Sequence, residues 1–191
     1  MANTSSYKVL SCDISWVDPS REEEAYEFIY GHKKMYHNIW QLPTEYLNPA
    51  LIDMMQSIGV PAIKGYFFRT PAHSKSHIHI DGGSFHDKWA INWAWGSEDH
   101  LMKWYKVKQE ASQNQYNSTG AGTNYLQFRS DMVEVIDSVQ IDMSHPVLCR
   151  VGIPHRVENY TKFPRWSVSI RDADIDKPTE RDWNWILQKL S

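Results

Sequence analysis

The pattern of hydrophobic and polar positions changes its period near residue 61. Before that point, an alternating run over residues 7–17 is followed by apolar positions at helical spacing over about residues 18–38 and 42–59. After it, apolar and polar residues alternate in short runs separated by Gly, Pro, Asn, Ser and Asp. These runs are residues 61–72, 76–81, 88–96, 101–107, 123–128, 132–142, 146–152, 154–159 and 165–171. The pattern therefore predicts a strand, two helices and then eight or nine strands.

So many short strands with few intervening helices favour a mainly β fold, a sandwich or barrel flanked by helices. A capping-box-like start at residues 179–182 predicts a short C-terminal helix that docks on the sheet. We expect one domain over residues 1–191, with residues 1–60 and 172–191 packed on a β core formed by residues 61–171. Residues 109–124 lack either pattern, which is typical of a lid, a binding loop or a plain hairpin connection.

Composition narrows the classes of partner. The 191-residue chain is 41% hydrophobic and has a formal net charge of -3, with 20 Lys and Arg against 23 Asp and Glu. It therefore lacks the basic footprint of a duplex nucleic-acid binder. Cys12 and Cys149 lie far apart without metal-binding spacing, as expected of isolated thiols in a reducing compartment. No secretory signal or membrane-length apolar segment is visible, so we expect a cytoplasmic protein with no membrane partner.

The stretch from Ser76 to Gly83 carries the first candidate chemistry. Strand alternation places His77, His79 and Asp81 on one face, and Ile78 and Ile80 on the other. A buried carboxylate or imidazole needs a partner, and a divalent metal would satisfy all three groups. The stretch therefore predicts a metal site. Two nearby histidines are expected at the surface: His73 and His86.

The second half of the chain offers partners for this stretch. His155 follows a Gly-Ile-Pro turn and is the best candidate for a distant metal ligand. Further on, Arg165, Ser167, Ser169 and Arg171 share one face of a predicted strand. An arginine with a hydroxyl two residues later can hold a carboxylate through a bidentate fork and one further hydrogen bond.

Together these parts resemble the 2-oxoglutarate and Fe(II)-dependent oxygenase superfamily. The resemblance rests on His79-x-Asp81, the distal His155 and the Arg165-x-Ser167 pair, and it covers about residues 61–171. The chain is also similar to small oxygenase-like proteins of marine phages, from the His-x-Asp motif through residues 89–92 to residues 104–105.

The resemblance implies a double-stranded β-helix, which is a cupin-like jelly roll. It implies Fe(II) held by His79, Asp81 and His155, and 2-oxoglutarate whose C5 carboxylate binds Arg165 and Ser167. The expected activity is that of a dioxygenase, most simply a hydroxylase, acting on an unidentified small molecule or peptide.

Several further residues have suitable chemistry. Asn92 and Tyr105 lie on strands expected to face the barrel interior, where they could donate hydrogen bonds to a keto acid. Arg171 shares a strand face with Arg165, but the Arg-x-Ser pattern favours Arg165, and Arg171 is expected to pair with Asp172, Asp174 or another surface carboxylate.

Two alternatives remain open from the sequence. A cupin metalloprotein that does not use 2-oxoglutarate would take ligands from His77-x-His79, and residues 152–159 match the end of the second cupin motif, but the Glu expected downstream in the first motif is absent. In the oxygenase reading His77 has only a supporting role. The other alternative is a non-catalytic jelly-roll module that binds a partner through its aromatic residues.

Overall fold

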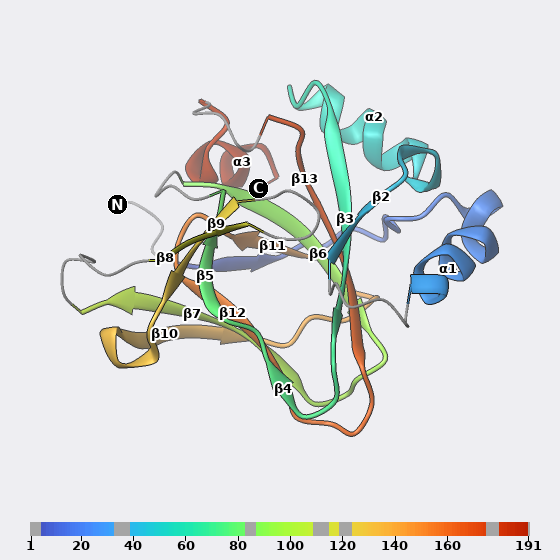
Figure 1. The fold of residues 1–191 in the computed structure, drawn as a ribbon. Helices are drawn as coiled ribbons and strands as arrows, with labels where there is room; N and C mark the ends of the chain where they lie inside the picture. The colour runs from blue at the N-terminus through green and yellow to red at the C-terminus, as the bar shows by residue number, and fades with distance from the viewer. Residues whose placement is uncertain are drawn as a thin grey trace.

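Two antiparallel sheets face each other in the computed structural model, and the helices lie outside them (Figure 1). The structure describes residues 5–32, 39–82, 87–108, 115–118, 124–174 and 180–190. One sheet has the order β1-β11-β6-β13-β3-β2. Its strands are β1 (Tyr7–Val9), β2 (Ile39–Leu42), β3 (Ile63–Thr70), β6 (Trp89–Trp95), β11 (Val147–Arg150) and β13 (Arg165–Asp172).

The second sheet has the order β10-β7-β12-β5-β9-β8, and a two-residue strand β4 also pairs with β12. Its strands are β4 (Ser74–Lys75), β5 (Ile78–Asp81), β7 (His100–Val107), β8 (Gln115–Ser118), β9 (Asn124–Phe128), β10 (Val133–Val139) and β12 (His155–Asn159). The helices are α1 (Glu22–Gly31), α2 (Pro49–Ser57) and α3 (Trp183–Lys189), with 3-10 turns at Pro19–Arg21, Thr44–Tyr46 and Ser130–Met132. No helix within the described residues is both long enough and apolar enough to cross a membrane.

The order of the strands is that of a jelly roll. Strands β3, β6, β11 and β13 belong to one sheet, and β5, β7, β10 and β12 to the other, so the chain crosses between the sheets repeatedly. The late strand β13 lies between β3 and β6, and β12 lies between β5 and β7. Strands from the two ends of the core thus become neighbours, as in a double-stranded β-helix. The predicted fold class is confirmed.

Strand β13 shows how the core is divided. Every one of its residues is buried. Trp166, Val168 and Ile170 belong to the main hydrophobic cluster, which also contains residues of all three helices. The alternate residues therefore point to the opposite face, toward the second sheet. This arrangement buries polar side chains at the centre of the molecule, between the two sheets.

Several boundaries differ from the sequence expectations. The first strand ends at Val9 rather than near residue 17. The second helix begins only at Pro49, because the Asn48 side chain caps it by accepting from the Ala50 amide at 3.0 Å. Strand β2 was not expected, and β8 lies inside the predicted unpatterned segment and pairs with β9.

The two remaining helices are shorter than expected. Helix α1 ends at Gly31, and the expected continuation to residue 38 falls largely outside the described residues. Helix α3 begins at Trp183, with Asp182 as its cap, which accepts from the Trp185 amide at 2.8 Å. Thr179, the start expected from the sequence, lies outside the described residues. The predicted start of a helix is wrong where a capping side chain decides which residue begins the helix.

Candidate metal centre

Two strands bring the candidate ligands together. In the pairing of β12 with β5, His155 lies opposite His79, and their ring centroids are 4.6 Å apart. Asp81 follows His79 by two residues and therefore projects from the same face of β5. One ligand atom from each of His79, Asp81 and His155 lies within 4.8 Å of the others, so the three could hold a metal ion.

The backbone sets the orientation of both imidazoles. Nδ1 of His79 lies 2.8 Å from the carbonyl oxygen of His77, and Nδ1 of His155 lies 2.9 Å from that of Ile153. Since a carbonyl oxygen only accepts, each Nδ1 carries a proton and donates it. In this tautomer a neutral ring has its lone pair on Nε2, and His79 Nε2 lies 3.4 Å from Asp81 Oδ1. Fixing the tautomer through the other ring nitrogen is typical of metal-binding histidines.

The local charges favour the protonation states that a cation needs. Burial by itself raises the pKa of Asp81, but the Arg171 guanidinium and the two histidines outweigh it and hold that pKa well below its usual range. Burial, together with His79, lowers the pKa of His155 to about 4 despite the opposing effect of Asp81. At neutral pH, Asp81 is therefore ionised and His155 is neutral, so metal binding would release no proton from either group.

Arg171 lies inside the molecule, which corrects the expectation of a surface ion pair. Its Nη1 lies 2.8 Å from Oδ2 of Asp81, and its Nε donates to the Ser169 hydroxyl at 3.2 Å. Asp172 projects from the other face of β13 and pairs with Arg181 instead. The sequence showed that Arg171 shares a face with Arg165, but it carried no signal that Asp81 would reach this arginine.

A cavity of about 290 Å³ joins the candidate ligands to the polar face of β13. The residues of that face that line it are Arg165, Ser167, Ser169 and Arg171. The predicted common face of these four residues is confirmed.

Arg165 is the unusual member of this group. It is 2% exposed, and its Nη1 donates to the Ser167 hydroxyl at 2.9 Å. Its Nε has no hydrogen-bond partner, and no carboxylate among the described residues forms an ion pair with it. Burial lowers its pKa to about 10, which still leaves the guanidinium charged at neutral pH. A buried charge without a counterion is costly, so this geometry is suited to binding an anion.

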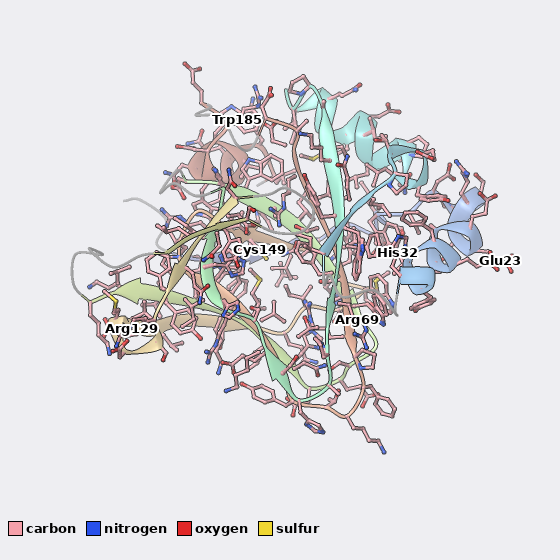
Figure 2. All side chains as sticks on the ribbon, in the orientation of Figure 1. Glu23, His32, Arg69, Arg129, Cys149 and Trp185 are labelled. Atoms are coloured by element: carbon pink, nitrogen blue, oxygen red, sulfur yellow. The ribbon has the colours of Figure 1, made fainter. Side chains whose placement is uncertain are left out.

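A third cavity-lining arginine, Arg69, does not share this position. Arg69, on β3, has its guanidinium 5.9 Å from the centroid of the Trp166 ring, on the helix side of the sheet. Figure 2 labels Arg69 beside the long strands and Cys149 nearer the centre of the molecule.

Burial raises the pKa of the Cys149 thiol to about 12, so this group is not a thiolate at neutral pH.

The other two predicted binding residues have different outcomes. Asn92 lines the cavity; its Nδ2 lies 3.9 Å from the Met102 sulfur, and its Oδ1 has no hydrogen-bond partner. Tyr105 does not line the cavity. It packs with Ile78, Ile80 and other apolar residues on the outer face of the second sheet. The expectation that Tyr105 faces the interior is wrong, because its neighbour Trp104 occupies the inward position on β7.

His77 lies apart from the three candidate ligands. It precedes β5, is exposed, and has its Nδ1 3.2 Å from Nε2 of Gln127. It borders a separate surface depression rather than the central cavity, so the structure does not bring it together with the three candidate ligands. His73 is exposed, as expected, and His86 falls outside the described residues.

Residues near one end of the cavity were missed. The end of β3, strand β4 and the residue after it contribute polar lining residues that no sequence motif marked: Thr70, Ser74, Lys75 and Ser76.

Comparisons with known proteins found only distant likenesses. No family model matches the chain, and no curated protein matches it. A prolyl-4-hydroxylase from Pseudomonas putida superposes with a TM-score of 0.46 at 8% identity, covering 88% of this chain and 92% of that one. A cupin 2 domain-containing protein from Halorhodospira halophila gives 0.39 at 14% identity, covering 97% and 90%.

A third solved structure is much longer than this chain. The E. coli protein ycfD gives a TM-score of 0.40 at 13% identity, and the match covers 70% of this chain but only 31% of that protein. All three likenesses are too distant to assign an activity. The jelly roll is instead established by the strand order.

Proposed function

We propose that this protein is a non-haem Fe(II)- and 2-oxoglutarate-dependent oxygenase, most simply a hydroxylase. One observation carries the proposal. A single cavity contains both a cluster of two imidazoles and one carboxylate, and a buried guanidinium without a carboxylate partner among the described residues.

The three clustered residues suit Fe(II). His79 and His155 would each offer Nε2, and Asp81 would offer a carboxylate oxygen, which is the ligand set typical of non-haem Fe(II) oxygenases. When bound, the iron would supply the redox chemistry by which O2 oxidises a keto acid and a second substrate together. The carbonyl groups of His77 and Ile153 keep Nδ1 of each ring protonated, so that Nε2 of each ring can face the metal.

Arg165 and Ser167 would bind the far carboxylate of the keto acid. A guanidinium can donate two parallel hydrogen bonds to a carboxylate, and the Ser167 hydroxyl, already 2.9 Å from Nη1, can donate a third. Asn92 also lines the cavity and has an amide that can contact the same cosubstrate. Tyr105 has no such role in this proposal.

The size of the cavity limits the second substrate. A volume of about 290 Å³ is at the lower end of the range for small-molecule sites, roughly 300–1,000 Å³. Once a dicarboxylate occupies part of it, the remaining space suits a small molecule or one peptide side chain. The apolar residues Met102, Val151 and Val157 also line the cavity and would help to exclude water from the site.

A cupin metal enzyme that does not use a keto acid is the second candidate. It would take His77 in place of Asp81 beside His79 and His155, and it would give Arg165 no carboxylate to bind. A non-catalytic jelly-roll module is the third candidate, and it requires neither metal nor cosubstrate.

Anaerobic titration separates these three candidates. Fe(II) with 2-oxoglutarate should produce a visible charge-transfer band and raise the melting temperature above that with Fe(II) alone. Arg165→Met should abolish the cosubstrate effect and leave metal binding intact, whereas Arg129→Met, which alters an exposed ion pair with Asp131, should change neither. Metal binding without any response to 2-oxoglutarate would favour the cupin enzyme. No metal binding would favour the non-catalytic module.

A further inference from the structure

We propose that Arg171 is a positioning residue that confines Asp81 to a single metal-facing oxygen and thereby preserves an open coordination position. The inference rests on the proposed metal-binding role of Asp81.

The two oxygens of Asp81 face different partners. Oδ1 lies 3.4 Å from Nε2 of His79, one of the candidate ligand atoms. Oδ2 lies 2.8 Å from Nη1 of Arg171 and forms a buried ion pair with it, and no other group among the described residues donates a hydrogen bond to this oxygen. A carboxylate held in this way presents one oxygen to the histidines and has the other engaged.

Arg171 is itself held in place from several directions. Its Nε donates to the Ser169 hydroxyl, and its guanidinium carbon lies 5.3 Å from the ring centroid of Tyr66 and 5.7 Å from that of Phe68. Its side chain is only 6% exposed. The residue also lies on β13, which is flanked by strands on both sides. A planar guanidinium fixed in this way cannot follow Asp81 if the carboxylate rotates.

The contact between Asp81 and Arg171 matters because of the number of positions around the metal. Two imidazoles and one carboxylate oxygen occupy three positions of an octahedral metal and leave three free. If both oxygens of Asp81 bound, only two positions would remain, which is enough for a chelating keto acid but leaves no position for O2. Engaging Oδ2 with Arg171 keeps the third position open.

Because Arg171 is charged, the proposed role and a purely structural role predict opposite changes in the affinity for the metal. Loss of an ordinary hydrogen-bonding partner of a ligand typically weakens metal binding by about 10–100-fold. Arg171 instead places a positive charge beside the ligand cluster and competes with the metal for the carboxylate. Removing it should therefore tighten metal binding while releasing the second oxygen of Asp81.

Co(II) without a keto acid is the probe, since it tests the ligand cluster alone. Arg171→Met should lower the Kd for Co(II) by about tenfold or more, and a crystal structure of the Co(II) form should show both Asp81 oxygens on the metal, against one in the wild type. Arg171→Lys keeps the charge on a shorter side chain, and its Kd for Co(II) should lie between the values of the wild type and of Arg171→Met. Arg181→Met is the matched control, because it breaks the Arg181–Asp172 pair on the other face of β13, and its Kd should equal the wild-type value.

An unchanged or raised Kd in Arg171→Met, with a single Asp81 oxygen still bound, would overturn the proposal. If Arg171→Met does not fold, Arg171→Lys decides, and a Kd at or above the wild-type value overturns the inference. If the wild-type protein binds Co(II) but does not respond to 2-oxoglutarate, the oxygenase proposal fails while the Co(II) result for Arg171 still holds or fails separately.

Discussion

His155 lies directly opposite His79 in the pairing of β12 with β5, although 76 positions separate them in the chain. Both rings direct Nδ1 to a backbone carbonyl. The jelly roll produces this relationship because its late strand β12 inserts between β5 and β7. The position of the candidate centre therefore depends on the register of one strand pair.

Removing one clustered ligand should abolish metal binding. We expect His155→Ala to raise the Kd for Co(II) at least about hundredfold, because even partners outside the ligand set typically contribute 10–100-fold. Isothermal titration calorimetry measures this directly. His77→Ala is the control and should leave the Kd unchanged, since His77 borders a different depression. Loss of binding in His77→Ala with retention in Asp81→Ala would instead indicate the cupin ligand set.

The metal-free protein should lose stability as the pH falls from about 6.5 to 4. His155 has a folded pKa of about 4 against an ordinary value of 6.5. Between these values the unfolded chain binds a proton that the folded chain does not, so the free energy of unfolding decreases with decreasing pH. The full difference corresponds to about 3 kcal/mol.

Urea unfolding at pH 7 and pH 4.5 measures this dependence. His155→Gln removes the titrating group and should reduce the dependence by a corresponding amount. An equally steep loss of stability in His155→Gln would assign the effect to other groups.

The outer face of β12 contains a buried carboxylate that should stabilise the fold. The Glu158 side chain is 0% exposed and contacts Lys75, Lys103, Arg156 and the Tyr160 hydroxyl. Although burial raises its pKa, hydrogen bonds from Lys103 and Tyr160 and the neighbouring positive charges lower it to about 2. Glu158→Gln leaves these cations without their carboxylate and should cost about 3 kcal/mol.

Chemical denaturation at pH 7 tests this cost. Glu134→Gln, on the neighbouring part of the same sheet, alters an exposed carboxylate and should change the stability by less than about 0.5 kcal/mol. Equal effects in the two variants would show that the cluster around Glu158 contributes little.

Much of the fold was predictable from the sequence because strand alternation and turn residues are local signals. Each of the nine runs expected after residue 61 overlaps a strand of the structure. Strand β2 was missed because Ile39–Leu42 is short and adjoins an expected helix, and β8 because its polar sequence has no apolar alternation. The pairing of β8 with β9 depends on tertiary context rather than on the local sequence.

The candidate site was only partly predictable, for a physical reason. Alternation placed Arg165, Ser167, Ser169 and Arg171 on one face, but it could not say which sheet surface Tyr105 would occupy or which carboxylate Arg171 would reach. The surface that Tyr105 occupies depends on the partner strands of β7. The carboxylate that Arg171 reaches depends on how the two sheets approach each other. Neither is encoded within a local segment.

A crystal structure of the protein with Mn(II), as an oxygen-stable substitute for Fe(II), and 2-oxoglutarate tests the central claim most directly. We predict a single metal bound by His79, Asp81 and His155, with the keto acid chelating it and the C5 carboxylate on Arg165 and Ser167. A metal bound through His77, or a keto acid that does not contact Arg165, would contradict the account.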